Sequence, residues 1–471
     1  MARRGAEACG RGRRTIQEVT SAHRAAVWRP RIRRLACFAI VALANVAFAA
    51  DIPADPTNYR QKLRDLRAGD TLRLAAGIYR DGLDVHRLVG TAAAPIAIVG
   101  ASKGARTVFR ARGGRNTISI VDSAYVRIAE LDLQGKGAFV DGVKAEGKSH
   151  FAHHITLERL RLRGFDGNQQ IVGISTKCPA WNWVIRDNVI EGAGTGMYLG
   201  DSDGSAPFMR GTIEGNTIVG TRGYSIEIKH QNGWPAIADL PDGRGETIIR
   251  YNAFAKDARS SGEGMARPNL LLGHWPLTGR GSDDRYVVYG NLIVDNPHEA
   301  LVQAEGNVVF YNNVLVNRFD DGLVIREHKD LPRTIDAFHN TIVTPGVGAL
   351  LRNGDPRFVQ RMAANAFFAS QVVPAALAGT NAVRGFDDPD ASALVALVEA
   401  ADRDGAAPWA SARHPLSASR HLLVDTTLPD ATLDFDRRRR SHETDGAYAG
   451  DRPPDPRRFL DLARVIRESL D

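Results

Sequence analysis

Charged side chains recur at the ends of short apolar strands in the middle of the chain. Glu227 and Lys229 flank Ile228, and the same alternation places Arg326 after Ile325. Successive side chains of a strand point to opposite faces, so these charged groups lie opposite the apolar face. The predicted outward row consists of Lys177, Asp201, Glu227, Lys229, His274, Glu305, Arg326 and His328. Cations bind carboxylates, and amines, imidazoles and carboxyl groups transfer protons, so the row suits acid–base chemistry on an acidic chain.

Aromatic residues and two long loops accompany this outward row. The aromatic residues that flank it are Tyr198, Tyr224, Trp234 and Trp275. Their rings could stack on sugar rings. The loops 231–246 and 256–268 would wall a groove, and loops on a rigid scaffold often carry binding residues. The alternative is that the charges only solvate an outward strand face, since such faces are usually polar.

One reaction that fits the row is removal of the hydrogen at C5 of a uronate, next to its carboxylate. This step needs a cation to neutralise the carboxylate, a base to take the proton, and an acid to protonate the leaving oxygen. Lys229 is the candidate base, because neighbouring cations would lower its pKa. His274 is the candidate proton donor. The predicted substrate-binding residues are Lys177, Tyr198, Glu227, Arg267, Glu305, Arg326 and His328.

A repeated sequence unit must position these residues. Each unit has a short apolar strand, an Asn, an apolar pair, a turn containing Gly, and a second strand. The shared residues are Asn188, Asn216, Asn252, Asn291, Asn313, Asn340 and Asn365, which lie 22 to 39 positions apart. Short strands that recur about every 25 residues predict an all-β solenoid, a right-handed parallel β-helix. An inward Asn at each bend could adopt a left-handed backbone conformation and bond the turn, so the Asn residues are interpreted as a structural ladder.

The two ends of such a stack need caps. Residues 59–66 have helical spacing and would cover the first coil. Residues 391–403 and 457–470 also have helical, amphipathic patterns. The charged run Arg437–Arg440 between them is interpreted as a solvated face. We therefore expect the C-terminal segment to pack along the last coils.

The start of the chain predicts export. A basic stretch precedes the apolar run Leu35–Ala49, which is too short to span a bilayer comfortably and ends in a small-residue cleavage motif. The predicted division is a signal peptide with a long n-region (1–49), the β-helix (50–380) and a C-terminal capping segment (381–471). The mature protein would be periplasmic or extracellular, without membrane contact after cleavage. It would retain Cys178 alone, so no internal disulfide is expected.

The charge balance argues against a nucleic-acid partner. The net charge of +7 comes from the first 49 residues, which hold ten Arg and two acidic residues. From Ala50 onward there are 51 basic and 52 acidic residues. A chain this close to neutral has no general attraction for nucleic acid or for an acidic membrane. Nothing in the sequence indicates an oligomer, so a monomer is expected.

Two segments carry a resemblance to a known family. The first runs from Ala68-Gly69-Asp70-Thr71-Leu72 through Gly77 and Tyr79 to Gly90-Thr91-Ala92 and Pro95-Ile96. The second is Asp434-Phe435-Asp436, Arg440 and Asp445-Gly446-Ala447-Tyr448. Together they resemble secreted β-helix proteins that act on polysaccharides, nearest the chondroitinase B and alginate lyase family. The resemblance covers most of residues 51–450 and implies a pectate-lyase-like fold.

The same resemblance implies site residues, with two departures. In that family a strand ending in a Lys, followed by an Asn-containing coil, carries the base, and Ile226–Lys229 followed by Asn252 is similar. The family has a catalytic Arg on the next coil, where this chain has Gly273-His274. The family's calcium-binding Glu falls at Tyr224. The resemblance thus suggests a calcium cofactor, but no residues of this chain are assigned as its ligands.

Three functions remain open at this point. The leading hypothesis is a polysaccharide lyase that cleaves a uronate-containing polysaccharide by β-elimination. The second is a glycoside hydrolase of the same fold, with Asp201 and Asp203 as its acid–base pair. The third is a non-catalytic carbohydrate-binding or surface protein, because a fold does not prove a function. The segment Asp295–Glu299 also faintly resembles the Asp-Pro-His motif of mannuronan epimerases, interrupted by Asn296.

Overall fold

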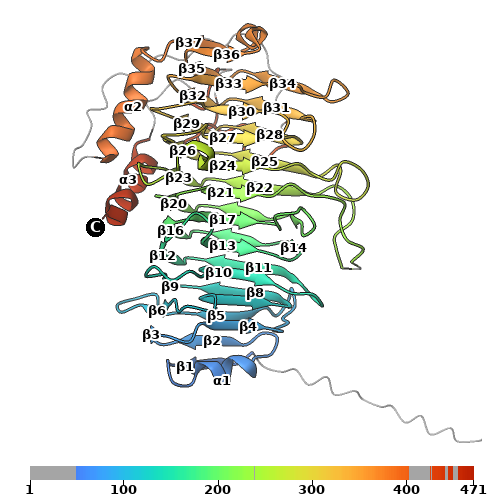
Figure 1. Cartoon of the computed structure of the whole chain (residues 1–471), viewed down its shortest axis with the longest axis vertical. Coiled ribbons are helices and arrows are strands. Elements are labelled where there is room, and N and C mark those ends of the chain that lie inside the picture. Colours follow the sequence, from blue (N-terminus) through green and yellow to red (C-terminus); the bar gives the residue numbers. More distant parts are fainter. Residues whose placement is uncertain are drawn as a thin grey trace, which may run out of the picture. The chain divides into compact units, whose positions relative to one another are not determined.

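Three parallel β-sheets are wound by the chain coil after coil, and each coil contributes strands to sheets A, B and C in turn (Figure 1). The computed structural model describes residues 49–237, 239–402, 425, 427–440, 444–448 and 455–470. The predicted signal peptide, apart from Ala49, lies outside the described residues, so its assignment stays a prediction. Within the described residues the three sheets have 14, 12 and 11 strands, and every strand pair is parallel. The predicted right-handed parallel β-helix is confirmed.

Sheet A consists of β1 (Asp51–Ala54), β2 (Thr71–Leu74), β5 (Ile96–Val99), β8 (Ser123–Ala129), β11 (Ala152–Glu158), β15 (Val184–Arg186), β19 (Thr212–Glu214), β22 (Glu246–Arg250), β25 (Arg285–Tyr289), β28 (Val308–Tyr311), β31 (Ile335–Phe338) and β34 (Gln360–Ala363). In addition, β14 (Ala180–Trp181) pairs with β11, and β18 (Phe208–Met209) pairs with β14. Sheet B consists of β3 (Gly77–Tyr79), β6 (Thr107–Arg110), β9 (Leu131–Gln134), β12 (Arg161–Phe165), β16 (Val189–Ala193), β20 (Thr217–Val219), β23 (Ala253–Ala255), β26 (Leu292–Val294), β29 (Val314–Val316), β32 (Thr341–Val343), β35 (Ala366–Phe368) and β37 (Ala382–Arg384). Sheet C consists of β4 (Leu83–His86), β7 (Ile118–Val121), β10 (Val143–Glu146), β13 (Val172–Thr176), β17 (Thr195–Leu199), β21 (Ile226–Ile228), β24 (Leu270–Leu272), β27 (Val302–Ala304), β30 (Leu323–Ile325), β33 (Val347–Leu351) and β36 (Gln371–Val373).

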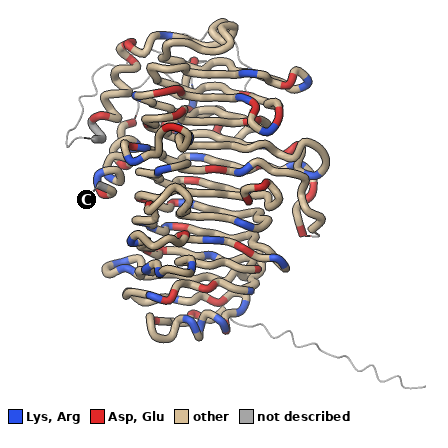
Figure 2. Tube along the Cα trace, viewed as in Figure 1, with Lys and Arg blue, Asp and Glu red and all other residues tan. Residues whose placement is uncertain are grey.

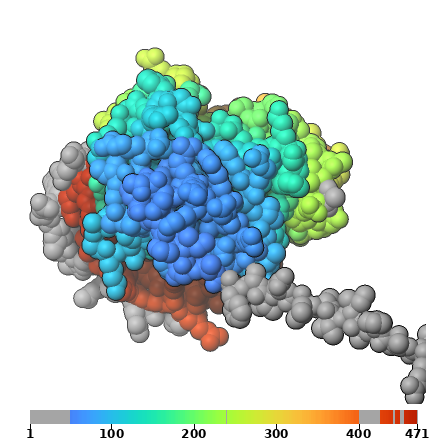
Figure 3. Space-filling view, turned by 90° about the horizontal axis from the view of Figure 1, so that it is seen from below, coloured from blue at the N-terminus to red at the C-terminus, as the bar shows by residue number. Residues whose placement is uncertain are grey.

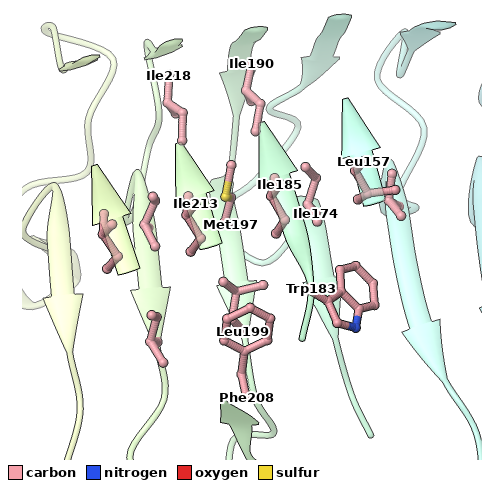
Figure 4. Packing of buried hydrophobic residues seen from close by; sticks show 14 of the residues in the cluster. Leu157, Ile174, Trp183, Ile185, Ile190, Met197, Leu199, Phe208, Ile213 and Ile218 are labelled. Atoms are coloured by element: carbon pink, nitrogen blue, oxygen red, sulfur yellow. The ribbon is translucent and has the colours of Figure 1, made fainter. Parts of the chain in front are cut away.

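The core is a column of apolar side chains that point inward from all three sheets. Ile185 of sheet A, Ile190 of sheet B and Met197 of sheet C meet in one coil, and all three are fully buried (Figure 4). The strands are short and alternate in exposure, as the period-two pattern predicted. Cys178 lies in this core as a buried free thiol, as expected of a small core-facing residue. The rigid column fixes which side chains of each strand face outward.

A continuous Asn ladder runs along the bend between sheets A and B. The side-chain amide of each member donates to the side-chain oxygen of the next, at 2.8–3.0 Å, from Asn188 through to Asn365 and on to Asn381. The expectation that the Asn itself takes a left-handed conformation is wrong, because the residue before it does so. Tyr251 and His339, for example, have φ values of 57° and 53°. That conformation turns the chain and leaves the Asn free to bond both neighbouring coils.

Helices form in the three segments predicted to be helical, but the C-terminal pair is not confined to the last coils. Helix α1 (Tyr59–Arg64) packs Tyr59 and Leu63 onto the first coil, at the end of the stack seen in Figure 3. Helices α2 (Pro389–Asp402) and α3 (Arg457–Leu470) follow one another along the stack (Figure 1), and their apolar residues pack against the outer face of sheet B. Helix α2 contacts β29 and β32, whereas α3 contacts the earlier strands β16, β20 and β23. None of the described helices is both long enough and apolar enough to cross a membrane.

The tail residues 427–440 cover part of the outer face of sheet A. Leu428 and Ala431 pack on a stack of aromatic rings formed by Tyr289, Tyr311 and Phe338. The interpretation of Arg437–Arg440 as a solvated face is wrong for Arg440, which is half-buried and donates to the Asn312 side chain and to the Gly446 carbonyl. The tail thus occupies the outer faces of sheets A and B. Figure 2 shows both signs of charge mixed along the stack, in agreement with the near-neutral composition beyond the leader.

Candidate active site

Two rows of outward side chains cross sheet C, and strand register decides their membership. One row runs through Lys144, Ser175, Tyr198, Glu227, Leu271, Gln303 and Val324. The second row follows two residues later and runs through Lys177, Gly200, Lys229, Gly273, Glu305 and Arg326. The sequence alternation therefore placed Lys177, Lys229, Glu305 and Arg326 on one row.

A groove of about 440 Å³ opens over the N-terminal part of these rows. Among the predicted site residues, it brings together Lys177, Tyr198, Glu227, Lys229 and Arg267. The other lining residues are Asp141, Lys144, Gln169, Gln170, Val172, Thr195, Ser202 and Tyr224. Its walls are mostly polar, and three of the predicted residues are cations. Such a groove suits an anionic, hydroxyl-rich ligand better than an apolar one.

The side chains of Lys177 and Lys229 converge on the Tyr198 ring. The Lys177 ammonium lies 3.7 Å from the ring centroid, and the Lys229 ammonium lies 5.8 Å from it. Gly200 stands between the two lysines in their row, and a Cβ at this position would lie 3.0 Å from the Lys229 Cβ. Since Gly200 has no side chain, both amines can lean toward the same ring. The Tyr198 hydroxyl group is within 3.1 Å of Ser202 Oγ.

Glu227 is a buried carboxylate at the floor of the groove. One of its oxygens accepts a hydrogen bond from Lys229 Nζ at 3.1 Å. Burial raises the pKa of Glu227, and the nearby lysines only partly offset this effect. For Lys229, burial lowers the pKa, but the Glu227 carboxylate and the Tyr198 side chain together outweigh burial, and the pKa is raised. The expectation that neighbouring cations lower the pKa of Lys229 is therefore wrong, because an anion two residues away on the same face dominates.

Lys177 shows the opposite balance. Burial lowers its pKa, and the carboxylates of Asp201 and Glu227 offset only part of that effect. The Asp201 carboxylate lies 3.6 Å from Lys177 Nζ, which is farther than the 3.1 Å between Glu227 and Lys229 Nζ. The phenol of Tyr198 has a pKa that burial raises, so it holds its proton at neutral pH. The groove therefore pairs an amine with a lowered pKa and a phenol with a raised pKa.

Arg267 enters the groove from the loop 256–268 rather than from a strand. Its guanidinium carbon lies 5.9 Å from the centroid of the Tyr224 ring. The loop also receives a hydrogen bond from the opposite wall, where Gln169 Nε2 donates to the Met265 carbonyl at 2.8 Å. The second expected wall, loop 231–246, contributes no lining residue to this groove in the part of the chain that the structure describes. Likewise, Trp275 is buried in the core and does not flank the site.

The structure does not bring the remaining predicted residues into the groove. His274 is 3% exposed, and its Nδ1 contacts the Trp275 carbonyl, because the chain turns inward after Gly273. Glu305 is 2% exposed, and its carboxylate accepts the backbone N–H groups of His274 and Lys329. His274 cannot reach a ligand in the groove, and Glu305 has a structural role.

Arg326 and His328 remain exposed but lie farther along the stack. The strand that precedes them, β30, is separated from β21 by β24 and β27. Sequence reasoning also missed lining residues. Lys144 follows the same strand alternation and could have been found, because Val143 and Ala145 beside it are buried. Gln169 and Gln170 come from a turn with no periodic signal.

The groove does not fit the calcium site that the resemblance implies. The carboxylate of Glu227 is held by an ammonium, and Asp141 accepts hydrogen bonds from the Val172 N–H and the Ser175 hydroxyl. Tyr224 occupies the position of the expected carboxylate ligand. Among the described residues no three His, Cys, Asp or Glu side chains form a group that could hold a metal ion. No step is therefore assigned to a metal.

Comparisons with known proteins relate the chain to other β-helix proteins. No protein-family model and no curated protein sequence matches it. An alginate lyase from Paenibacillus sp. str. FPU-7 is similar in structure, with 20% identity over 61% of this chain and 99% of that chain and a TM-score of 0.41. A mannuronic acid specific polysaccharide family 6 lyase from human gut microbiota has 14% identity over 69% of this chain and 83% of that chain, with a TM-score of 0.43. A GH136 lacto-N-biosidase from Eubacterium ramulus has 12% identity over 71% of this chain and 68% of that chain, with a TM-score of 0.43.

Proposed function

We propose that the protein is an exported polysaccharide lyase that cleaves a uronate-containing polysaccharide by β-elimination. The observation that carries this proposal is the convergence of Lys177 and Lys229 on Tyr198, above a buried carboxylate, in a polar groove. A uronate unit needs cations for its carboxylate and two separate groups for proton transfer. The groove supplies all of these within one coil and its two neighbours.

The two lysines have different roles in this proposal. Lys229, held in its charged form by Glu227, would bind the substrate carboxylate and make the C5 hydrogen more acidic. Arg267 would add a second contact to the carboxylate that strengthens substrate binding. Lys177, whose pKa burial lowers, would act as the base in its neutral form. The base role thus moves from Lys229 to Lys177. The reason is the carboxylate beside Lys229, which makes a neutral amine at that position unfavourable.

Tyr198 would complete the reaction as the acid. The Lys177 amine takes the C5 proton, and the electrons of the C5–H bond form a double bond between C4 and C5. The C4–O bond then breaks, and its oxygen takes the proton of the Tyr198 hydroxyl. The proton gained by Lys177 returns to the phenolate after product release, so the site is restored. Tyr198 lies between the two lysines, which would stabilise its phenolate form.

A panel of acidic polysaccharides tests the proposal. The purified protein is incubated with alginate, pectate, hyaluronan and chondroitin, and ultraviolet absorbance and reducing ends are both followed. A lyase produces an unsaturated uronate that absorbs, together with reducing ends. Reducing ends without absorbance would identify a hydrolase, and binding without either product would identify a binding protein.

Matched variants tie any activity to the groove. Lys177→Met should abolish the absorbance signal, because it removes the base. Lys103→Met, an exposed lysine in a turn far from the groove residues, should leave it unchanged. If both variants retain full activity, the assignment of this groove is wrong. If neither product forms with any substrate, β-elimination of these uronates is not the function.

A further inference from the structure

Arg267 differs from the other groove cations because a loop, not a strand, must hold it. The loop 256–268 leaves β23 and returns just before β24, with a short 3₁₀ turn at Glu263–Met265. The Arg267 guanidinium donates to the carbonyls of Gly264 and Ala266, at 3.1 and 2.6 Å. These contacts stay within the loop. The position of Arg267 over the groove therefore depends on what anchors the loop backbone.

The backbone carbonyl of Arg267 is anchored by two side chains. Lys256 Nζ donates one hydrogen bond to it, and Asn296 Nδ2 donates another at 2.8 Å. Asn296 is itself fixed, because the same amide group also donates to Asn269 Oδ1 at 3.0 Å. The carbonyl thus accepts two side-chain donors from two different coils. Neither Lys256 nor Asn296 lines the groove.

Lys256 is an unusual anchor because its amine is buried. The residue is 4% exposed and lies in the wall of a second cavity, of about 500 Å³, formed where α3 packs against sheet B. Burial lowers the pKa of Lys256 to about 7, with Glu299 as the partly compensating anion and Arg267 as a further unfavourable cation. Withdrawing an amine from water is costly unless it makes a strong hydrogen bond. The bond to the Arg267 carbonyl is the contact that offsets this cost.

We propose that Lys256 is a positioning residue that holds the Arg267 guanidinium over the groove, through its hydrogen bond to the Arg267 carbonyl. The proposal rests on the proposed function for its kinetic consequence. Lys256 does not touch the substrate, because it does not line the groove. Its loss should therefore weaken binding of the substrate carboxylate and leave proton transfer by Lys177 and Tyr198 largely intact.

A double-mutant cycle provides the kinetic test. Lys256→Met keeps the length of the side chain and removes the donor, and it should raise KM about tenfold with kcat little changed. Arg267→Ala should raise KM at least as much. In the Arg267→Ala background, the second substitution should add nothing, because Lys256 acts only through Arg267. Effects that add in full would overturn the proposal.

Two further variants separate positioning from general loss of stability. Lys256→Arg keeps an N–H donor, and the adjacent cavity has room for the larger guanidinium group. This variant should therefore recover most of the substrate affinity that Lys256→Met loses. Ser260→Ala removes a different bond of the same loop, from Ser260 Oγ to the Asp257 carbonyl at 2.8 Å, and should leave KM unchanged. If Ser260→Ala raises KM as much as Lys256→Met, the loop is merely fragile and Lys256 has no special role.

Hydrogen exchange separates this inference from the proposed function. Amide exchange of the peptide covering residues 256–270 is compared in the wild type, Lys256→Met and Lys256→Arg without any substrate. Faster exchange in Lys256→Met, restored in Lys256→Arg, supports the positioning role even if no polysaccharide is cleaved. Unchanged exchange in Lys256→Met refutes the role, whatever the enzyme assays show.

Discussion

Glu227 and Lys229 leave the same strand on the same side, and their charged atoms lie 3.1 Å apart. This ion pair separates the chemistry of two lysines that the sequence presents as equivalent. Lys229 has the carboxylate beneath it and a raised pKa. Lys177, two coils earlier in the same row, has only a more distant carboxylate partner and a lowered pKa. The groove therefore holds one permanent cation and one titratable amine.

Substitution of the two lysines should give different kinetic signatures. Lys177→Met should lower kcat by about 10²–10⁴-fold with a small change in KM, since general base catalysis contributes about that factor. Lys229→Met should raise KM as well as lower kcat, because it removes a carboxylate-binding charge. Steady-state kinetics on the preferred polyuronate measures both. Identical profiles for the two variants would contradict the division of roles.

The pH dependence of the reaction should follow Lys177. Its amine must be neutral to accept a proton, so kcat should rise as the pH approaches its lowered pKa from below. Asp201→Asn removes an anion that raises this pKa, so the rising limb should move to lower pH. Asp203→Asn is the control, because Asp203 bonds the Ser205 N–H and does not pair with Lys177. A limb that moves upward in Asp201→Asn would exclude Lys177 as the base.

Each Asn of the ladder should contribute far more to the free energy of unfolding than a typical polar contact does. Asn291→Ala leaves the backbone and side-chain donors of Asn252 without their shared acceptor, and it removes the donor to Asn313. Unsatisfied buried groups cost about 1–3 kcal/mol each, so the unfolding free energy should fall by about 3 kcal/mol or more. Asn232→Ala, at an exposed site with one hydrogen bond, should change it by less than about 1 kcal/mol. Urea unfolding compares the two, and equal losses would argue against the ladder as a stabilising device.

Acid should destabilise the fold through His339. Burial and the nearby Arg440 lower the pKa of this imidazole from 6.5 to about 3. The unfolded chain therefore binds a proton that the folded chain refuses, so stability is complete above about pH 6.5 and falls as the pH drops toward 3, by up to about 1.4 kcal/mol per unit. His339→Asn, which tolerates the left-handed backbone here, should show a smaller loss between neutral pH and about pH 4.5 than the wild type. The exposed His328→Asn variant should behave as the wild type, and a flat wild-type profile would count against this role.

Strand alternation was enough to predict the fold and the shared row of Lys177 and Lys229. The spacing of the Asn residues and the period-two pattern led to the parallel β-helix, and the outward row of Lys177 and Lys229 followed from the same pattern. The pattern fails where a strand ends. His274 comes one residue after Gly273, at the point where the chain turns into the core, so counting by two no longer applies. Helices α1 and α3 were also predictable from the helical spacing of their apolar residues.

The electrostatics and the loop contacts could not be predicted in the same way. Sequence position shows that Glu227 and Lys229 share a face, but only the geometry shows that their charges meet and raise the pKa of Lys229. Arg267 was a candidate because of its loop, whereas the anchoring of its carbonyl by Lys256 joins parts of the chain with no common periodicity. Non-local packing decides such features, and no local pattern records it.

The Asn ladder begins at Asn188, and this sets a mechanical boundary inside the stack. At the equivalent bend, the two preceding coils carry Leu131 and Leu160, so the ladder of side-chain amides does not include them. Under a pulling force applied at both ends of the β-helix, these early coils would unfold first. The coils from Asn188 onward, which the ladder joins, would unfold at higher force. Because the groove spans this boundary, from Lys144 to Lys229, stretching the protein would disrupt the groove before the later coils unfold.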